Sequence, residues 1–472
     1  MECLLTSGVG SACLRPGAGV GVSAQGQWRR AFFGSDREVK LRKCWSERRA
    51  RRFATSASVV EYDVVIVGAG VIGVATAHHI LTTTPLSVAL VDAREPCAGA
   101  TGAGQGYIWM THRKPGTPGW HLAKRSKALW ETFAMEVEDS GLNPTEALGW
   151  RKTGSLLVAS TDEQAKYLQN WAQVLSEAGA ATDFLTHLEA VNMEPALATG
   201  CLTAAALCHD DLQIDARLTI DTLLQRVRDF ESRGRYKELF QSPVQHFIRS
   251  SREGRLIGVE IPEGKVFGKS AVVIATGAWS SLLMKTATTE WGMSLVPPMK
   301  PRKGHLLVIE GTHDIQLKSG IMECEYLSYN SQSSKSTEAT TEPGPSIVMT
   351  ATLDPNGNLL LGSYREFAGF NIDVQDEVIE KMVERAARFL PGVSNMEGRV
   401  RTGLRPYIND GRPMIGPVDD VPGLIFATGH EGSGLCLSLA TAEMVTNIIQ
   451  DVKGPVESAP FLPNGRLSSS TM

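Results

Sequence analysis

A glycine-rich turn between two apolar stretches constrains this chain more than any other feature. Residues 64–67 form a continuous apolar run, as expected of a parallel strand buried on both faces. Gly68, Gly70 and Gly73 follow it with the spacing G-x-G-x-x-G. The first glycine permits a tight turn, the second lets a pyrophosphate approach the backbone, and the third lets a helix pack closely on the strand. A second apolar stretch then ends in Asp92, about 20 residues after the last glycine.

Strand, glycine turn, helix, second strand and acid together predict a dinucleotide-binding site. The phosphates would lie at the free N–H groups and positive end of the helix that begins near Ala69. The Asp92 carboxylate would accept hydrogen bonds from the ribose hydroxyls. An incidental glycine turn is the alternative, and the motif alone does not distinguish NAD from FAD. The residues predicted to contact the dinucleotide here are Gly68, Ala69, Gly70, Val71, Ile72, Gly73, Asp92 and Ala93.

Composition places the chain among ordinary globular proteins. Its 472 residues are 42% hydrophobic and 21% charged, enough for two or three domains, and the formal net charge is −4. This balance gives no global attraction to nucleic acid or to an anionic membrane. The longest nearly uncharged run, 64–80, is interrupted by the glycine turn, so we expect no transmembrane segment. The eight cysteines form no CxxC or Cys/His set, which predicts no metal site and no disulfide framework and fits a reducing compartment.

The first 57 residues differ from the rest. They hold nine Arg and two Lys against one Asp and three Glu, a balance of +7. No apolar segment long enough for a secretory signal appears, so this stretch resembles an organellar transit peptide. The alternative is a disordered basic arm that binds an acidic partner. An uncharged start slightly favours the plastid (chloroplast), whereas Arg51, Arg52 and Phe53 before Ala54 would suit a mitochondrial cleavage site.

Helix and strand signals alternate along the remaining chain. Residues 161–164 form a capping-box pattern that predicts a helix to about residue 178, and Asp215 can cap a helix that runs to about residue 232. Residues 354–357, Asp-Pro-Asn-Gly, predict a hairpin. Residues 328–346 are rich in Ser, Thr, Glu and Pro, which predicts a mobile loop.

Two linked motifs near the end of the chain identify a family. The first is GLRP-x3-DGRPMIGP within residues 402–417, and the second is LIFATGHEGSGL at 424–435. With ATGAWS at 275–280, they make the chain resemble the FAD-dependent D-amino-acid oxidase superfamily, in the branch of glycine oxidase, sarcosine oxidase and D-amino-acid dehydrogenase. The resemblance covers about residues 61–451 and implies FAD in place of NAD.

The resemblance implies that FAD is held by several separate segments. Residues 401–417 contain no cysteine, although sarcosine oxidases carry a flavin-linking cysteine near this block, so noncovalent FAD is expected. Asp92 stands where the family usually has Glu, and residues 103–106 replace its Asn-Ala-Gly step. Besides the N-terminal turn, the expected contacts are Thr101, Gly102, Gln105, Gly106, Thr276, Gly277, Trp279, Gly429, His430, Gly432, Ser433, Gly434 and Leu435.

Arg405 is the residue we expect to bind substrate. A planar guanidinium pairs with a carboxylate through two parallel hydrogen bonds, and in glycine oxidase-like relatives the arginine of this LRP step binds the substrate carboxylate. The alternative is a structural arginine paired with Asp410 or Glu431. Arg401 is a second choice for the substrate. His430 lies at the position beside the flavin and is a weaker catalytic candidate, since a lone histidine is usually structural.

The implied reaction is oxidation of a C–N bond in an amino acid or secondary amine by hydride transfer to flavin, with oxygen or a quinone as electron acceptor. The competing hypothesis is an organellar flavoprotein assembly or scaffold factor, in which FAD only stabilises the fold. The expected fold class is α/β and α+β, with a Rossmann-type FAD-binding domain and a mixed-sheet substrate domain. We predict a disordered transit peptide at 1–57, FAD-binding parts at 58–144, 226–294 and 371–455, substrate-domain parts at 145–225 and 295–370, and a disordered tail at 456–472.

Overall fold

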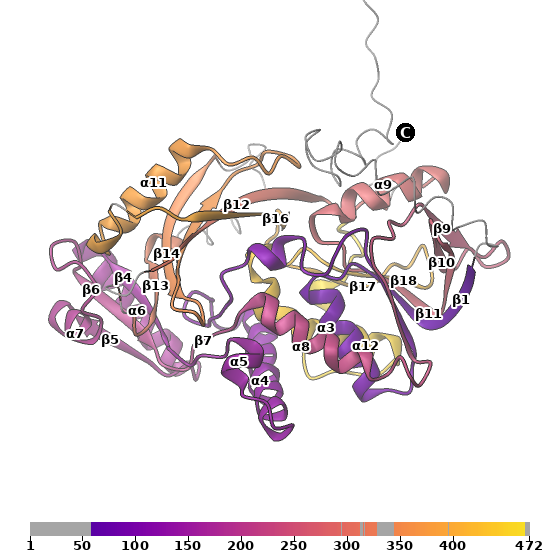
Figure 1. Ribbon diagram of the computed structural model, residues 1–472, viewed down its shortest axis with the longest axis horizontal. Coiled ribbons are helices and arrows are strands. Elements are labelled where there is room, and N and C mark those ends of the chain that lie inside the picture. The colour runs from indigo at the N-terminus through magenta and orange to yellow at the C-terminus, as the bar shows by residue number, and fades with distance from the viewer. Residues whose placement is uncertain are drawn as a thin grey trace, which may run out of the picture. The chain divides into compact units, whose positions relative to one another are not determined.

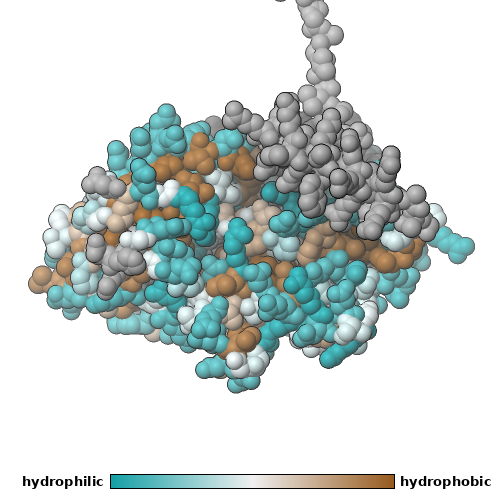
Figure 2. Space-filling view, in the orientation of Figure 1, coloured by the Kyte–Doolittle hydropathy of each residue, from teal (hydrophilic) through white to brown (hydrophobic). Residues whose placement is uncertain are grey.

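The computed structural model describes residues 58–293, 295–311, 315, 317–327, 344–394 and 396–467 (Figure 1). The transit-peptide prediction for 1–57 lies outside these residues, as does nearly all of the loop predicted at 328–346. The described residues belong to one compact unit, which begins at Ala54. On its visible face polar residues predominate and apolar ones are scattered between them (Figure 2).

The first sheet grows from the glycine motif. β1 pairs in parallel with β2 on one side and with β11 on the other, and β11 pairs in parallel with β18. Residues 64–66 of β1 have no exposed surface, which is why this end of the strand is apolar. The sheet runs β17-β18-β11-β1-β2-β8, and β10 and β9 extend it beside β11. Its strands are β1 (Ser58–Val67), β2 (Val88–Val91), β8 (Tyr236–Leu239), β9 (His246–Arg249), β10 (Leu256–Ile261), β11 (Gly264–Ile274), β17 (Met414–Pro417) and β18 (Leu424–Thr428).

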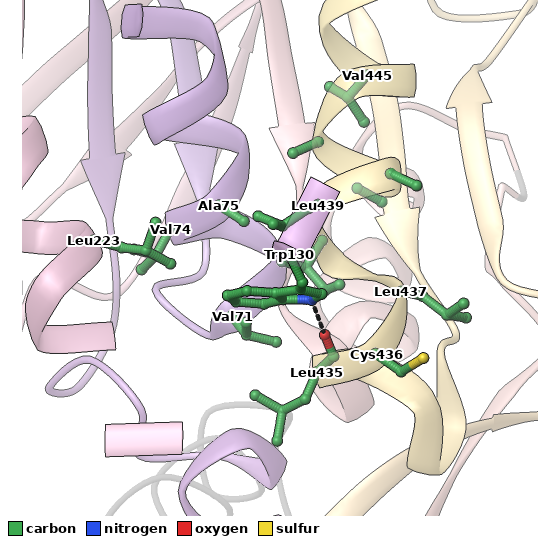
Figure 3. Close-up of a cluster of buried hydrophobic side chains, with 14 of the residues drawn as sticks. Val71, Val74, Ala75, Trp130, Leu223, Leu435, Cys436, Leu437, Leu439 and Val445 are labelled. Atoms are coloured by element: carbon green, nitrogen blue, oxygen red, sulfur yellow. Dashed lines mark hydrogen bonds between the residues drawn. The ribbon is translucent and has the colours of Figure 1, made fainter. Parts of the chain in front are cut away.

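Helices from distant parts of the chain cover this sheet. Figure 3 shows Trp130 close to Val71 and Leu435, and its indole N–H donates to the Leu435 carbonyl at 3.1 Å. The segment Glu431–Ile449 has the length and apolarity of a membrane-crossing helix, but 56% of it is buried within the protein, as in a core helix. The helices around this sheet are α3 (Val71–Thr83), α4 (Pro118–Asp139), α5 (Pro144–Leu148), α8 (Ala216–Arg228), α9 (Ser280–Glu290) and α12 (Gly434–Ile449).

The second sheet is mixed. β4 pairs in parallel with β13, and the other pairs are antiparallel. The order is β16-β12-β15-β14-β13-β4-β6-β5. The strands are β4 (Ser155–Ala159), β5 (Thr182–Thr186), β6 (Ala204–Cys208), β12 (Met299–Ile309), β13 (Gly320–Glu323), β14 (Ser346–Leu353), β15 (Leu359–Arg365) and β16 (Arg399–Ile408), and the helices are α6 (Asp162–Glu177), α7 (His187–Met193) and α11 (Asp376–Ala387).

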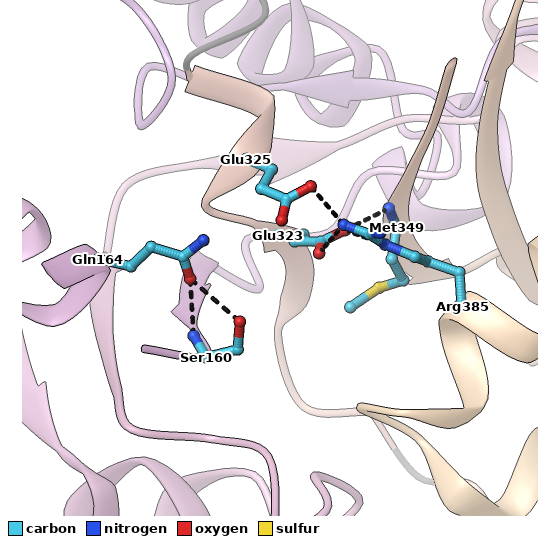
Figure 4. Close-up of polar contacts among 6 residues, drawn as sticks. All are labelled: Ser160, Gln164, Glu323, Glu325, Met349 and Arg385. Atoms are coloured by element: carbon cyan, nitrogen blue, oxygen red, sulfur yellow. Dashed lines mark hydrogen bonds and ion pairs between the residues drawn. The ribbon is translucent and has the colours of Figure 1, made fainter. Parts of the chain in front are cut away.

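Side-chain hydrogen bonds cap one helix beside the second sheet and fix another to that sheet. Thr161 caps α6, as the sequence pattern predicts, by accepting from the Gln164 N–H at 3.2 Å. Arg385 of α11 binds Glu323 at 3.0 Å through Nε and also pairs with Glu325, which ties α11 to the end of β13 (Figure 4). The short strands β3 (Tyr107–Ile108) and β7 (Leu212–Gln213) pair with each other beside the two sheets.

The fold class is confirmed, with a Rossmann-type sheet and a mixed sheet. The hairpin at 354–357 is also confirmed, since it joins β14 to β15 and Asp354 accepts hydrogen bonds from the Asn356 and Asn358 N–H groups. Asp215 caps α8, but the helix ends at Arg228, before the predicted residue 232.

Three predicted boundaries are wrong. Residues 376–408 belong to the second sheet, because α11 packs on β14 and β15 and β16 is that sheet's edge strand. α8 belongs with the first sheet, because its apolar face packs in the core around α3. Residues 456–467 are not a loose tail. Phe461 is fully buried, and Arg466 pairs with Asp410 at 2.9 Å.

Candidate cofactor and substrate site

The glycine turn forms a cradle in which Gly68 and Gly73 have no room for a side chain. Gly68 has φ +114°, and a Cβ there would lie 2.4 Å from the Ala275 carbonyl oxygen. A Cβ on Gly73 would lie 1.8 Å from the Gly68 carbonyl oxygen, so any side chain would push α3 away from the turn. Gly70 is the N-cap of α3 and provides no side chain to cap it. The start of α3 therefore offers backbone N–H groups and the helix dipole to an anion.

Thr101 closes this cradle from the side. Its hydroxyl oxygen accepts a hydrogen bond from the Val71 N–H at 3.1 Å, and a Cβ on Gly70 would lie 3.3 Å from the same oxygen. Residues 100–103 form the short helix η2. The predicted contacts Val71, Ile72 and Thr101 thus gather at one helix end, which fits a pyrophosphate.

Asp92 lies at the end of β2, beside the turn. One of its carboxylate oxygens accepts from the Ala69 N–H at 2.6 Å, and the other accepts from the Arg94 N–H at 2.7 Å. Burial raises the pKa of Asp92, and these two backbone hydrogen bonds oppose that rise. Each oxygen can accept more than one hydrogen bond, so ribose hydroxyls can bind here as well. Ala93 next to it is half-buried.

The loop at residues 102–106 can offer a cofactor main-chain groups, because its side chains are absent or engaged elsewhere. Gly106 has φ +94°, and a Cβ there would lie 1.9 Å from the Ile214 carbonyl oxygen. A Cβ on Gly102 would lie 2.3 Å from the Cys97 carbonyl oxygen. The side chain of Gln105 points into the second sheet, where it bonds Thr350, Thr352 and the Leu360 carbonyl oxygen. The Gln105 amide is therefore structural.

Residues 276–279 follow β11 at the same edge of the first sheet. The Thr276 hydroxyl lies 2.9 Å from the Ser280 hydroxyl, and the Gly277 carbonyl oxygen accepts from Ser280 at 2.8 Å. The Trp279 ring lies 5.9 Å from that of Phe370, which places the tryptophan where the two sheets meet.

The second glycine turn joins β18 to α12. Gly429 has φ +80°, and a Cβ there would lie 2.3 Å from the Ile408 side chain. Residues 431–433 form the short helix η5, and Ser433, the N-cap of α12, makes no side-chain capping bond. Gly434 and Leu435 begin the helix. This junction offers a second helix end without a side-chain cap.

His430 points away from this opening and into the protein. Its Nε2 lies 2.9 Å from the Thr441 hydroxyl of α12, and the side chain is buried. Burial lowers the pKa of His430 to about 3, so the imidazole is neutral at physiological pH. A neutral ring held by Thr441 favours the structural alternative for His430 over proton transfer.

Arg405 lies on β16, facing the second glycine turn. Its guanidinium donates to the carbonyl oxygens of Tyr364 at 3.2 Å and Lys303 at 3.5 Å. A Cβ on Gly304 would lie 2.0 Å from Arg405 Nη1, so glycine at 304 makes room for the guanidinium. The residue is half-buried, and burial lowers the pKa of Arg405 without removing its charge. Arg401, the second choice, is also half-buried on β16.

The predicted acidic partners of Arg405 pair with other arginines. Asp410 binds Arg412 at 3.2 Å as well as Arg466, and Glu431 binds Arg302 at 3.5 Å. Within the described ranges no carboxylate lies within 4.0 Å of Arg405. Arg405 thus forms no direct ion pair with either acid, although the charge of Glu431 opposes the fall in the pKa of Arg405.

Four further residues of this site were missed by the sequence analysis. Arg302 lies directly opposite Arg405 on β12, and its guanidinium packs over the rings of Phe367 and Tyr407 at 5.5 and 5.2 Å. The other three are Arg365, Tyr107 and Tyr326. Arg302, Arg365 and Tyr326 stand in no motif, and Tyr107 only borders the glycine-rich loop, so no local signal marked any of them.

Comparisons with known proteins identify the family. A family model described as FAD dependent oxidoreductase, abbreviated DAO, matches residues 63–448, which is most of the chain. The chain belongs to this family. The resemblance found in the sequence is thus confirmed, and with it an FAD-dependent oxidoreductase.

The match between this chain and its relatives in the family extends over nearly the whole length of those relatives. Glycine oxidase of Pseudomonas aeruginosa is 27% identical over 412 residues, covering 86% of this chain and 99% of that protein. Glycine oxidase of Geobacillus kaustophilus is 28% identical over 416 residues, covering 85% and 96%. The crystal structure of glycine oxidase from Geobacillus kaustophilus superposes with a TM-score of 0.71 at 24% identity, covering 87% of this chain and 100% of the other. L-proline dehydrogenase from P. horikoshii has the same fold, with a TM-score of 0.71 at 19% identity, covering 86% and 98%.

Proposed function

We propose that the protein oxidises the C–N bond of an amino acid or secondary amine. The observation that carries this proposal is Arg405, a half-buried guanidinium bonded to neutral carbonyl oxygens and facing the second glycine turn. Such a group is suited to the carboxylate of a substrate. The names of the relatives, glycine oxidase and iminodiacetate oxidase among them, support an amine that carries a carboxylate.

Both glycine turns would hold FAD, which supplies a hydride acceptor when bound. Gly70 and the start of α3 would bind the pyrophosphate, and Asp92 would bind the ribose. The junction at Gly429–Leu435 would place N–H groups and a helix dipole beside the flavin ring. The contacts proposed at residues 101–106 and 276–279 complete the set.

The protein's own groups would orient the substrate and favour its neutral amine. Arg405 would hold the carboxylate and so orient the α-carbon. Arg302 and Arg365 lie in the same region, and their positive charge opposes an ammonium group. Substrate amine would therefore bind deprotonated without a dedicated base. His430 is already neutral and directed to Thr441, so it does not enter this step. The imine product would hydrolyse in water, and electrons would pass on to oxygen or a quinone.

Anaerobic flavin reduction tests the proposal. Purified holoprotein is mixed with a panel of glycine, sarcosine, proline and dicarboxylic amines without oxygen, and flavin absorbance is followed. Bleaching by one or more amines supports turnover. If none of these amines reduces the flavin of a folded, FAD-bound protein, the assembly-factor hypothesis would explain the protein better.

We further propose that FAD is noncovalent and that residues 1–57 direct the protein to an organelle, the plastid slightly ahead of the mitochondrion. The cysteine-free block at 401–417 supports the first proposal. The +7 charge balance of residues 1–57 supports the second. Acid precipitation should release yellow flavin into the supernatant, and flavin retained in the pellet would contradict noncovalent binding. Import of the fused segment 1–57 into isolated plastids and mitochondria tests the destination.

A further inference from the structure

Three guanidinium groups gather where the second sheet faces the turn between β18 and α12. Arg302 and Arg405 lie opposite each other on β12 and β16, and Arg365, which is 3% exposed, ends β15. Burial alone would raise the pKa of Glu431, but the charges of Arg365, Arg405 and Arg302 together lower it. Like charges opposite one another in a sheet are unfavourable, so this region gains from bound negative charge.

Arg365 stands beside two hydroxyl groups. Its guanidinium lies over the Tyr326 ring, 4.4 Å from the ring centre, and the Tyr326 hydroxyl lies 3.1 Å from that of Tyr107. In such a pair one hydroxyl donates to the other, and the second keeps its proton for a further acceptor. An arginine has five N–H donors, so Arg365 can bind an anion in addition to its contacts within the protein. Guanidinium and hydroxyl donors together match a carboxylate.

The tyrosine pair lies within electrostatic range of both arginines. Burial raises the pKa of Tyr107, and the positive charges of Arg365 and Arg405 oppose that rise. The rings of Tyr107 and Tyr326 are in turn held by His112, whose ring centre lies 5.9 and 5.5 Å from theirs. The two hydroxyls therefore stand on a packed aromatic support near Arg365 and Arg405.

We propose that the substrate carries two carboxylates, one bound by Arg405 and the second by Arg365 with the Tyr107–Tyr326 hydroxyl pair. This inference rests on the proposed function and names its substrate class: an amine whose nitrogen substituent or side chain ends in a second carboxylate. A substrate with an apolar group in that position would set hydrocarbon against the guanidinium charge of Arg365 and the hydroxyl pair, with no carboxylate to balance that charge, which is unfavourable.

Matched substrate pairs test this directly on the wild-type holoprotein. Sarcosine and iminodiacetate differ by one carboxylate on the nitrogen substituent, and racemic alanine and aspartate differ by one on the side chain. We expect the dicarboxylate of at least one pair to reduce the flavin with at least ~10-fold higher kcat/KM, which equals ~1.4 kcal/mol. Equal or better reduction by both monocarboxylates would overturn the inference and leave the proposed function standing.

Nonreactive ligands give a readout that does not need turnover. Propionate is succinate with one carboxylate replaced by hydrogen, so the two ligands differ by that group alone. Succinate should perturb the flavin absorbance with a Kd at least ~10-fold lower, and should raise Tm more at equal concentration. If no amine reduces the flavin, the proposed function fails, and this binding comparison alone decides the inference. Equal Kd values would then overturn it.

Substitution tests whether Arg365 binds the second carboxylate. Arg365→Met removes the charge but keeps a long side chain, and should lower the succinate-over-propionate preference at least ~10-fold. Arg399→Met is the matched control, because Arg399 is on the same strand as Arg405 with 61% of its side chain exposed, and it should keep the preference. An unchanged preference in folded Arg365→Met would overturn the assignment. If that variant does not fold, Tyr326→Phe, which removes one hydroxyl, should lower the same preference, and no change would count against the proposal.

Discussion

At the scale of single residues, one substitution at Arg405 distinguishes a substrate-binding arginine from a structural one. Arg405→Lys keeps the charge but loses the planar fork that binds a carboxylate in two places. We expect FAD to stay bound and the Kd for a carboxylate ligand to rise ~10- to 100-fold. Ligand titration and a melting curve on the same variant check this. A variant that loses Tm but binds carboxylates normally would show that the bonds to Tyr364 and Lys303 are its main role.

Asp92 performs two tasks that substitution can separate. Its carboxylate holds the Ala69 and Arg94 N–H groups and is also placed to bind ribose. Asp92→Ala should weaken FAD binding by about 1.5–3 kcal/mol for each charge-assisted hydrogen bond lost. Asp92→Asn keeps one acceptor oxygen for the turn and loses the charge, so it should fold better than the alanine variant. Titration of apoprotein with FAD measures both, and wild-type affinity in Asp92→Ala would remove the residue from the site.

At the scale of elements, the junction between β1 and α3 distinguishes a packing glycine from a binding glycine. Gly73→Ala places a Cβ 1.8 Å from the Gly68 carbonyl oxygen and should cost about 3 kcal/mol or more in the free energy of unfolding. Gly70→Ala meets only Thr101 Oγ1 at 3.3 Å, at φ −74°, so it should fold and lose FAD affinity. Denaturant unfolding with FAD titration checks the pair. Equal stability of the two variants would contradict the cradle geometry.

A second element, the turn after β3, is held by Asp211, and this carboxyl group should make stability depend on pH. The fully buried Asp211 accepts from the Met110 and Thr111 N–H groups and from the Ser155 hydroxyl. Burial raises the pKa of Asp211 to about 6 from its ordinary 3.8. Between these values the folded protein binds the proton and the unfolded chain does not, so stability should fall as pH rises from 4 to 6, by up to about 3 kcal/mol.

Asp211→Asn should remove this part of the pH dependence. Unfolding free energies of both proteins at pH 4 to 7 isolate it, because other titrating groups are shared. The difference between wild type and variant should change across pH 4–6 and be flat above 7. A difference that is constant with pH would place the pKa of Asp211 near its ordinary value.

For the whole molecule, local sequence patterns predicted the features that neighbouring residues form by themselves. The β1–α3–β2 unit, Asp92 and the hairpin at 354–357 follow from spacing and turn chemistry alone. Strand register is not written in local sequence, so the pairing that sets Arg302 against Arg405 could not be foreseen. The period of α11 shows that it buries one face but not against which sheet, which is why its domain was misassigned.

Residues 1–57 should be dispensable for the folded protein. Their composition is strongly basic, and the described core begins at Val64. Ser58 already belongs to β1, where its N–H donates to the Glu263 carbonyl oxygen at 3.1 Å. A protein that begins at Ser58 should therefore be soluble, bind FAD with unchanged affinity and keep its Tm. Full-length protein prepared in parallel is the control. Aggregation without flavin of the shortened protein alone would mean that the segment takes part in the fold, and that the transit-peptide proposal is wrong.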